Sequence, residues 1–522
     1  MKKATIYLLL MLLLAAACTS PQASEETAKT PLFNDSTSVF FDEAMKPFYH
    51  GVASGDPLAD AVVIWTRVTP DFAEPQQVKW MVASDEAFAE VVKEGTTEAL
   101  PENDFTVKID VTGLAPATTY FYKFEHEGAP SVTGRTRTAP GAGAEALKFA
   151  FVSCSNYEAG LYNAFARIAD RADLDAVVHL GDYIYEYGPG VYGDSAVQRF
   201  HLPKKEIIEL QDYRTRYAQY RLDPDFRRAH QVHPFIAIWD DHEIANNSYK
   251  TGAQNHQPGE EGDYEARKAA ARKAYFEWLP VRETTEQRLY RHISYGDLAD
   301  LILLDERLEG RAKQAESVEE LLADSTRTML GQEQLSWFTE NLAASQATWK
   351  LIGNQVIFAD LDVSPVYNVP VNMDAWDGYP AEKQRIINFI DKNAVENVVF
   401  LTGDTHSSWA FEIARDNAAY KAGTDTETVA VEFGTPSITS SNSNERYPDY
   451  SVKVAESVVA SAQFNPHLKY VNLRDHGYLL LSVTPQQATA EWYYVPTLKQ
   501  KTTEETLAKR ITVQAGQEKL VQ

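Results

Sequence analysis

The sequence predicts an α/β protein in which a small β-sandwich domain precedes a larger domain of alternating strands and helices. Up to about residue 140, short segments of alternating hydrophobicity are separated by turn residues, a pattern typical of a sandwich. After residue 140, apolar segments alternate with helical patterns, which favours parallel strands covered on both faces. The length of 522 residues and the hydrophobic content of 44% are ordinary for two or three globular domains.

The first 45 residues predict a signal peptide and a tether. Residues 1–18 begin with Lys2 and Lys3, continue with an apolar run too short to span a bilayer comfortably, and end in small residues before Cys18. This pattern resembles a bacterial lipoprotein signal peptide, and simple cleavage with release is the alternative. Residues 19–45, whose first part is rich in Ser, Thr, Glu and Pro, predict a flexible tether.

A lipoprotein signal implies a location for the mature chain. We expect a membrane anchor through lipid on Cys18, in the periplasm or at the cell exterior. Thr19 is not an acidic retention residue, which favours the outer membrane if the cell is Gram-negative.

Residues 46–140 predict the β-sandwich. Turn residues separate four segments of strand-like alternation: Ala61–Arg67, Gln77–Val82, Thr106–Val111 and Thr119–Phe124. The segment Leu114–Tyr120 resembles the loop that leads into a fibronectin type III strand, with Tyr120 as the candidate for a tyrosine corner. The Gly-rich segment Pro140–Ala144 then predicts a linker.

Residues 141–522 predict the larger domain. Helical patterns cover Asp263–Leu279, Gly331–Ala344 and Ala381–Lys392. Strand-like segments beyond Thr428 predict a second sheet: Ala430–Phe433, Gly477–Val483 and Ala488–Val495. The polar tail Lys499–Gln522 is expected to be peripheral.

Four apolar segments of this domain end in side chains that can bind metals. Ala176–Leu180 is followed by Gly181 and Asp182, and the other three segments are followed by Cys154, by Asp240, Asp241 and His242, and by Asp404 and His406. Because open α/β sheets collect ligands at the carboxyl ends of their strands, we expect these side chains at one edge of one sheet. The donor set suits one or two metal ions bridged by an oxygen, an arrangement used for displacement at phosphorus.

Cysteine content and charge narrow the choice of function. The chain has two cysteines, so a lipidated Cys18 would leave Cys154 without a disulfide partner. Alone, Cys154 would be a buried, inert thiol, but its place at a strand end favours metal ligation. The net charge of −25 argues against a nucleic-acid-binding surface.

An ordered set of motifs from Phe48 to Tyr478 resembles the alkaline phosphatase D (PhoD) family of calcineurin-like metallophosphoesterases. The motifs are Phe48–Pro57, Ser153–Ser155, His179–Tyr187, Trp239–Asn247, Leu304–Arg307, Gly403–Trp409 and Asp475–Tyr478. The resemblance implies a four-layer α/β/β/α sandwich behind the N-terminal β-sandwich, and a site that holds iron and calcium ions. We also expect the protein to be a monomer that acts on a small phosphate-ester substrate.

The resemblance also implies roles for particular residues. Cys154, Asp182 and Tyr185 match the iron-binding residues of the family, and Asp404 and His406 match its closing Asp-x-His motif. Asp241 falls where the superfamily has a metal-ligating Asn, and His242 where it has the His beside the scissile phosphate. Among Asp240, Asp241, Asn246 and Asn247 we rank Asp241 first as a metal ligand and include Asn247. Arg307, which follows the predicted strand Leu301–Asp305, is a candidate for contacting phosphate.

The function expected from these residues is hydrolysis of phosphomonoesters or phosphodiesters by metal-activated water, with Asp182, His242 and Arg307 as catalytic residues. Thiolate and phenolate ligands favour Fe(3+), and hard oxygen ligands favour Ca(2+). Family members commonly have a twin-arginine signal, whereas this chain has Lys2 and Lys3, so zinc or manganese could compete for the same ligands outside the cytoplasm. Two alternatives are a hydrolase with Cys154 as nucleophile and a non-catalytic surface-binding lipoprotein.

Overall fold

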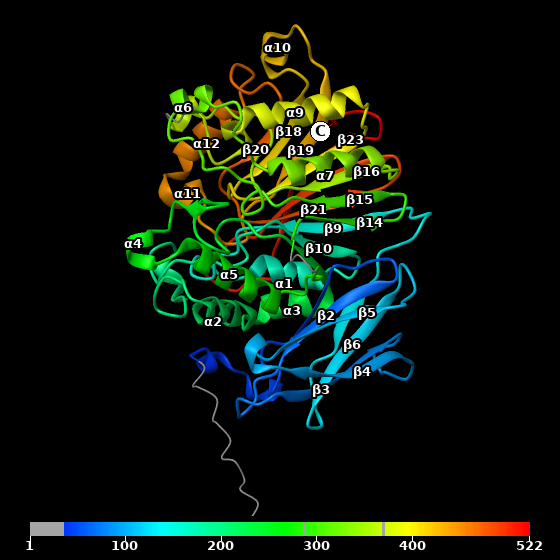
Figure 1. The fold of residues 1–522 in the computed structure, drawn as a ribbon. Helices are drawn as coiled ribbons and strands as arrows, with labels where there is room; N and C mark the ends of the chain where they lie inside the picture. The colour runs from blue at the N-terminus through cyan, green and yellow to red at the C-terminus, as the bar shows by residue number, and fades with distance from the viewer. Residues whose placement is uncertain (1–35, 285–287, 368–370, 522) are drawn as a thin grey trace, which may run out of the picture.

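The computed structural model describes residues 36–284, 288–367 and 371–521. Figure 1 shows two large sheets stacked between two groups of helices, with the N-terminal strands below them. The predicted signal peptide, Cys18 and most of the predicted tether lie outside the described residues. Within the described residues, none of the helices combines the length and the apolar character needed to cross a membrane.

The first large sheet has ten strands with a parallel centre. In spatial order they are β24 (Leu520–Val521), β23 (Thr506–Gln514), β22 (Gln487–Tyr494), β21 (Gly477–Val483), β9 (Leu147–Val152), β10 (Ala176–His179), β11 (Pro234–Ala237), β1 (Val52–Gly55), β2 (Ala61–Arg67) and β5 (Thr106–Thr112). β10 pairs in parallel with both β9 and β11 and is buried along its whole length. Its β-branched, apolar sequence is the one expected of a strand covered on both faces.

The second large sheet has seven strands and faces the first. Their order is β14 (Arg291–Tyr295), β15 (Ala299–Leu303), β16 (Trp349–Gly353), β17 (Val398–Thr402), β19 (Thr428–Gly434), β18 (Ser408–Ala414) and β20 (Leu468–Asn472). β15, β16, β17 and β19 run parallel to one another. Phe149 and Phe151 of the first sheet belong to the same core cluster as Leu351, Val399 and Phe433 of the second. The largest core cluster therefore fills the space between the two sheets, and it also extends to helical residues beside the first sheet, such as Phe226 and Tyr275.

Helices cover the outer face of each sheet (Figure 1). Beside the first sheet lie α1 (Asn163–Asp170), α2 (Leu210–Arg221), α3 (Pro224–Val232) and α5 (Tyr264–Trp278); beside the second lie α7 (Gly331–Ala344), α9 (Pro380–Lys392) and α12 (Asp449–Val459). The three predicted helices correspond to α5, α7 and α9. Ile386 and Ile390 of α9 are buried in a cluster with Phe400 of β17. The predicted four-layer α/β/β/α arrangement is confirmed.

Shorter elements occupy the connections. They are the helices α4 (Pro258–Glu261), α6 (Val318–Ala323), α8 (Ser364–Tyr367), α10 (Asn417–Ala422) and α11 (Ser443–Arg446), the 3₁₀ turns η1 (Ser38–Phe40), η2 (Glu43–Met45), η3 (Pro101–Asn103), η4 (Ser195–Val197) and η5 (Trp376–Gly378), and the hairpin of β12 (Ser248–Tyr249) and β13 (Gly252–Ala253).

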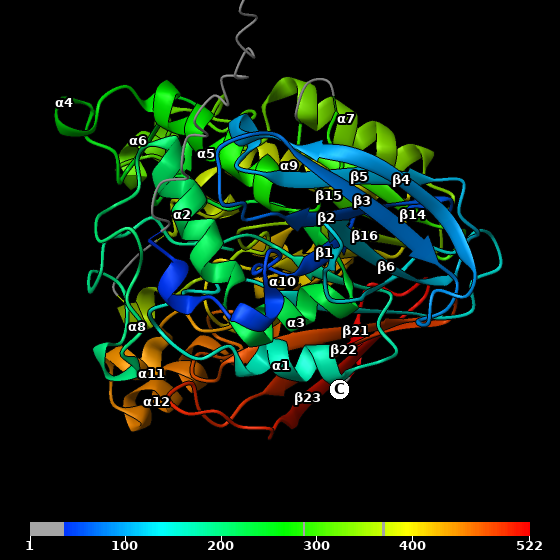
Figure 2. The same ribbon diagram turned by 90° about the horizontal axis from the view of Figure 1, so that it is seen from below.

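The N-terminal strands form a sandwich that shares a sheet with the larger domain (Figure 2). One layer consists of β4 (Val91–Ala99), β3 (Gln76–Ala83), β6 (Thr119–His126), β7 (Ala129–Pro130) and β8 (Gly134–Arg137), and it packs on β1, β2 and β5 through a core that includes Val62, Val78 and Tyr122. The hydroxyl of Tyr120 accepts a hydrogen bond from the backbone N–H of Ala115 at 2.9 Å, which is the contact expected of a tyrosine corner. β1 pairs in parallel with β11, so the second layer of the sandwich continues into the ten-stranded sheet.

Two expectations for the C-terminal part are wrong. Of the strands predicted beyond Thr428, β19 lies in the second sheet, but β21 and β22 join the first sheet, where β21 pairs antiparallel with β9. The tail is not merely peripheral, because β23 pairs with β22 and buries Ile511 and Val513. Hydrophobic alternation identifies a strand but does not say which sheet it joins, and in β23 the buried positions are too few to stand out.

Candidate metal centre

The predicted site residues come together where β9, β10, β11 and β17 end. Cys154, Asp182 and Asp241 follow strands of the first sheet, whereas Asp404 and His406 follow β17 of the second sheet. The expectation of one edge of one sheet is therefore wrong, since the site lies between the carboxyl ends of both sheets. The sequence shows where a strand ends, but sheet membership depends on tertiary pairing.

The backbone turns sharply at most of these side chains. Cys154, Asp182, Asn247, Asp404 and His406 all have positive φ angles, between 52° and 58°. Residues with a Cβ rarely adopt this left-handed conformation, which costs about 1–3 kcal/mol and persists where the surroundings enforce it. Beside Asp182, Gly181 has φ 105°, and a Cβ on it would lie 2.3 Å from the Cβ of Asp240. Gly181 thus lets the turns after β10 and β11 approach each other.

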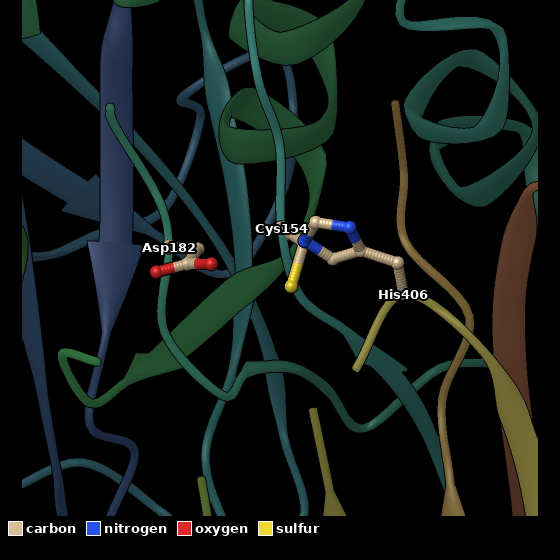
Figure 3. A group of neighbouring side chains, drawn as sticks. All are labelled: Cys154, Asp182 and His406. Carbon is tan, nitrogen blue, oxygen red and sulfur yellow. The ribbon is translucent and has the colours of Figure 1, made fainter. Parts of the chain in front are cut away.

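One group of possible ligands combines sulfur, oxygen and nitrogen. The ligand atoms of Cys154, Asp182 and His406 all lie within 4.8 Å of one another (Figure 3). The hydroxyl of Tyr185 donates to Asp182 Oδ2 at 2.8 Å and lies 3.4 Å from His406 Nε2. His406 Nδ1 lies 2.9 Å from the carbonyl oxygen of Ser441, so Nε2 is the nitrogen that faces this group.

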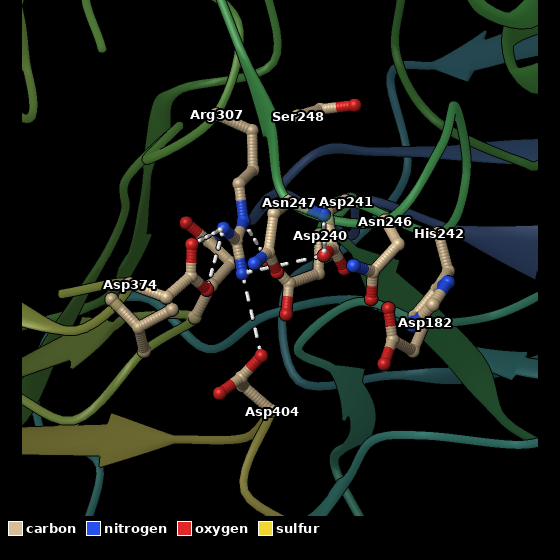
Figure 4. Close-up of polar contacts among 12 residues, drawn as sticks. Asp182, Asp240, Asp241, His242, Asn246, Asn247, Ser248, Arg307, Asp374 and Asp404 are labelled. Carbon is tan, nitrogen blue, oxygen red and sulfur yellow. Dashed lines mark hydrogen bonds and ion pairs between the residues drawn. The ribbon is translucent and has the colours of Figure 1, made fainter. Parts of the chain in front are cut away.

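Two further groups are richer in carboxylates (Figure 4). Asp182, Asp241 and His242 form one, and Asp240, Asp241 and Asp404 form the other, again with ligand atoms within 4.8 Å of one another. The backbone N–H of Asn247 donates to Asp241 Oδ2 at 2.5 Å. The side-chain amides of Asn246 and Asn247 both donate to Gln254 Oε1, at 3.1 and 2.8 Å.

The ligand atoms in the three groups are suited to binding cations. Asp182 Oδ1, Asp240 Oδ2 and Asp241 Oδ1 are buried and have no hydrogen-bond partner among the described residues. A buried carboxylate oxygen without a partner is costly, and a bound cation would satisfy it. Burial, together with nearby carboxylates, raises the pKa of both Asp182 and Asp404 well above the ordinary range. Burial and Asp182 likewise raise the pKa of the Cys154 thiol, so bound cations would take the place of protons.

Arg307 lies at the centre of the carboxylates and is fully buried. Its guanidinium donates to Asp240, contacts both oxygens of Asp374 at 2.9 Å, and approaches Asp404 Oδ1 at 3.3 Å (Figure 4). These three carboxylates engage its donors, so the expected contact with phosphate stays a prediction. Asp374 does not follow a strand, and nothing in the sequence pattern pointed to it.

His242 is paired with the carboxylate of Glu186, to which the sequence pattern assigned no role. His242 Nδ1 lies 2.6 Å from Glu186 Oε2, and Glu186 Oε1 accepts from the backbone N–H of Asn246 at 2.8 Å. Burial lowers the pKa of His242, but Asp241, Glu186 and Asp182 outweigh it and raise the pKa well above 6.5. These carboxylates therefore favour the protonated form of the imidazole.

Glu243 is a second site residue that could not be identified from the positions of the strand ends. Its carboxylate accepts from the backbone N–H groups of Tyr183, Asp240 and Asp182, at 2.6, 2.9 and 3.1 Å. Glu243 thus fixes the turn after β10 against the turn after β11. Its position as the third acid of the Asp240–Glu243 run was the one available signal.

Comparisons with known proteins agree with this geometry. The family model described as PhoD-like phosphatase matches residues 149–492, and the model of the N-terminal domain of the same family matches residues 35–140. The chain is 40% identical over 475 residues to alkaline phosphatase D of Bacillus subtilis (strain 168), covering 86% of this chain and 78% of that protein.

Solved structures give the same result. A structure of PhoD superposes with a TM-score of 0.81 at 37% identity and covers 91% of this chain and 92% of the other. The purple acid phosphatase PPD1 of yellow lupin (Lupinus luteus) superposes with a TM-score of 0.54 at 12% identity, covering 89% of this chain and 73% of the other, and shares the fold. The family model, the curated relative and the PhoD structure each match most of the chain, which also has the four layers and the N-terminal sandwich. The chain therefore belongs to the PhoD-like phosphatase family and is a phosphatase of that type.

Proposed function

We propose that this phosphatase is a secreted, metal-dependent enzyme that hydrolyses small phosphomonoesters, phosphodiesters or both. The observation that carries the proposal is that Asp182 and Asp241 each belong to two of the three possible ligand groups. One carboxylate can therefore serve two neighbouring cations, an arrangement suited to phosphoryl chemistry. The buried carboxylate oxygens without hydrogen-bond donors support the same proposal.

The ligands divide into a soft set and a hard set. We assign Fe(3+) to Cys154, Asp182 and Tyr185, since a thiolate and a phenolate favour a trivalent transition metal. Ca(2+) would take oxygen ligands from Asp241, Asn247 and Asp404, with His406 completing the centre. Zinc or manganese is the alternative occupant.

The residues of the chain would orient the substrate and move protons. Bound cations would polarise the phosphoryl oxygens and lower the pKa of the attacking water towards neutrality. His242, whose protonated form is favoured by Glu186, can donate its Nε2 proton to a phosphoryl oxygen or to the leaving group. Arg307 would offset the charge of the carboxylates and, if Asp374 releases it, contact the phosphoryl group.

The proposal is favoured over a cysteine hydrolase. Cys154 is fully buried, and burial together with Asp182 raises the pKa of its thiol, whereas a cysteine nucleophile needs an exposed, low-pKa thiol. A cavity of about 970 Å³ lined by Asn247, Asp374, Tyr249 and Gln314 gives the centre room for an ester substituent. A purely binding lipoprotein would need neither the cavity nor the buried carboxylates.

We also propose a cellular location and an oligomeric state. The basic start and the small residues before Cys18 support a lipid anchor at the periplasm or cell exterior, with the outer membrane favoured. The net charge of −25 supports the absence of a nucleic-acid-binding surface, and we infer a monomer.

Metal removal tests the function directly. Purified enzyme is analysed for metals, treated with a chelator and assayed with 4-nitrophenyl phosphate and bis(4-nitrophenyl) phosphate. Loss of hydrolysis on chelation and recovery on adding metal back are expected. Full turnover by metal-free protein would exclude the proposed mechanism.

A further inference from the structure

Arg446 places a cation near the candidate metal centre. It ends the short helix α11 and is exposed. In the part of the chain that the structure describes, no ion pair joins its guanidinium to an acidic side chain. Its contacts are with Tyr192, whose hydroxyl it approaches at 3.5 Å and whose ring it overlies at 5.8 Å.

Tyr192 connects Arg446 to the centre. Its hydroxyl lies 3.4 Å from His406 Nδ1, so two successive contacts lead from the guanidinium to a candidate ligand. Its ring lies 6.4 Å from the ring of His242, nearly parallel at 17°, and 5.6 Å from the ring of Tyr187. The two half-buried tyrosines therefore lie beside each other and beside His242, where their rings can contact a bound substituent.

The residues next to Arg446 are held by hydrogen bonds and line a cavity. Oε1 of the neighbouring Glu445 accepts a hydrogen bond from His476 Nε2 at 2.9 Å, and His476 Nδ1 lies 2.9 Å from Ser437 Oγ. A cavity of about 690 Å³ is lined by Gly193 and Glu445, the sequence neighbours of Tyr192 and Arg446, and also by Arg474, Asp194 and Asp475. A group bound by Arg446 would thus have room beside the centre.

Two other arginines near the centre differ from Arg446 because they pair with carboxylates. Arg307 is engaged by Asp240, Asp374 and Asp404, and Arg474, which lines the same cavity, pairs with Glu456 at 2.9 Å. In a chain with a net charge of −25, a guanidinium left without a carboxylate attracts anions that the rest of the surface repels. Guanidinium groups bind phosphate and carboxylate oxygens in pairs.

We propose that Tyr187, Tyr192 and Arg446 form a subsite for one ester substituent of the substrate, in which Arg446 binds a second anionic group. The inference rests on the phosphoesterase function proposed above and deepens it. The substrate class is a phosphate ester whose substituent carries a further phosphate or carboxylate. The tyrosine rings contact the body of the substituent.

Two substrates that differ by one phosphate test the subsite: thymidine 5′-(4-nitrophenyl phosphate) and the same compound with a 3′-phosphate. Release of 4-nitrophenolate reports cleavage of the same ester bond in both. The enzyme is expected to prefer the 3′-phosphorylated substrate by about tenfold in kcat/KM, the size of one charge-assisted hydrogen bond at a partly exposed site. Arg446→Gln should abolish this preference by lowering kcat/KM for the 3′-phosphorylated substrate, and Arg446→Lys should retain part of it.

Arg415→Gln is the matched control, because Arg415 is an ion-paired arginine in the loop before α10. It should leave the preference intact. Equal turnover of both substrates by the wild-type enzyme, or an equal loss for both in Arg446→Gln, would overturn the subsite. If neither of these diesters nor the monoester 4-nitrophenyl phosphate is cleaved, the proposed function fails instead. Whenever the two diesters are not cleaved, calorimetric binding of thymidine 3′,5′-bisphosphate against thymidine 5′-phosphate decides the subsite. Tighter binding of the bisphosphate that is lost in Arg446→Gln supports it, and equal binding refutes it.

Discussion

Glu186 Oε2 lies 2.6 Å from Nδ1 of His242, and both side chains are buried. The pair fixes the imidazole with Nε2 available to the centre, and the rings of Tyr185 and Tyr187 lie 4.2 and 5.4 Å from that of His242. A carboxylate in this position orients the ring and stabilises its cation.

Replacing Glu186 should therefore reduce catalysis more than folding. Glu186→Gln keeps the shape but removes the charge, and we expect a fall in kcat of about 10–100-fold, as for other partners that orient active-site histidines. Steady-state kinetics together with thermal unfolding would measure it. Glu206→Gln is the control, because Glu206 shares Asn255 as a partner with Glu186 but pairs with Arg267. A kcat equal to that of wild type in Glu186→Gln would rule out the orienting role.

Asp182→Ala and Asp404→Ala should remove activity without loss of structure. Burial raises the pKa of both carboxyl groups, so in metal-free protein they stabilise little and Tm should stay the same or rise. With metal added, Tm should rise in wild type and much less in the variants. Near wild-type turnover of a chromogenic monoester or diester in either variant would show that the centre is elsewhere.

Much of the fold could be predicted because each element carries its own pattern. The apolar segments before Asp182 and Asp404 are β10 and β17, and the apolar stripe of α9 is buried as expected. Sheet membership could not be predicted. β21 pairs with β9 although more than three hundred residues, including β10, β11 and the whole second sheet, separate them in the sequence, and no local pattern predicts such a pairing.

The site residues also fall into a group that the sequence could identify and a group that it could not. Residues directly after strands, such as Cys154 and Asp241, could be named because strand ends deliver them. Glu186, Glu243 and Asp374 act through contacts with groups on other elements, at separations of 56 to 67 residues. Their roles depend on tertiary structure, as do the left-handed backbone conformations at Cys154 and Asp182.

Iron binding should give the protein a colour. A phenolate and a thiolate bound to Fe(3+) absorb visible light by charge transfer, and Tyr185→Phe should remove most of that band. Ser440 Oγ donates to the hydroxyl of Tyr185 at 2.6 Å, so Ser440→Ala should shift the band without abolishing it. Visible spectroscopy with metal analysis measures both effects. Colourless, fully active protein without iron would refute the iron assignment and leave the phosphoesterase proposal intact.

The location can be tested at Cys18. Cys18→Ser prevents lipidation, so the chain should move from the membrane fraction to the soluble fraction after cell fractionation. Changing Thr19 to Ser is the control and should keep the protein in the membrane. Membrane retention unaffected by Cys18→Ser would count against a lipid anchor.

The last prediction concerns acid stability and the imidazole of His50. The side chain is fully buried, and neither ring nitrogen has a hydrogen-bond partner among the described residues. Burial, with Arg67, Arg221 and Arg227, lowers the pKa of His50 well below 6.5. Below the unfolded pKa of about 6.5 the unfolded chain binds a proton that the folded chain does not, so the free energy of unfolding falls as pH decreases.

His50→Phe keeps a ring beside Phe41 and Trp278, 5.9 and 5.1 Å away, and removes this titration. Compared with wild type, the variant should gain about 1.4 kcal/mol for each pH unit below about 6.5, down to the folded pKa of His50. Urea unfolding of metal-free protein at pH 7.5 and at a pH about two units lower measures the difference, and other buried histidines cancel in the comparison. Phe48→Leu, a change at a buried residue that does not titrate, should shift stability equally at both pH values. If His50→Phe, like Phe48→Leu, changes the free energy of unfolding equally at both pH values, the imidazole is not held neutral by burial.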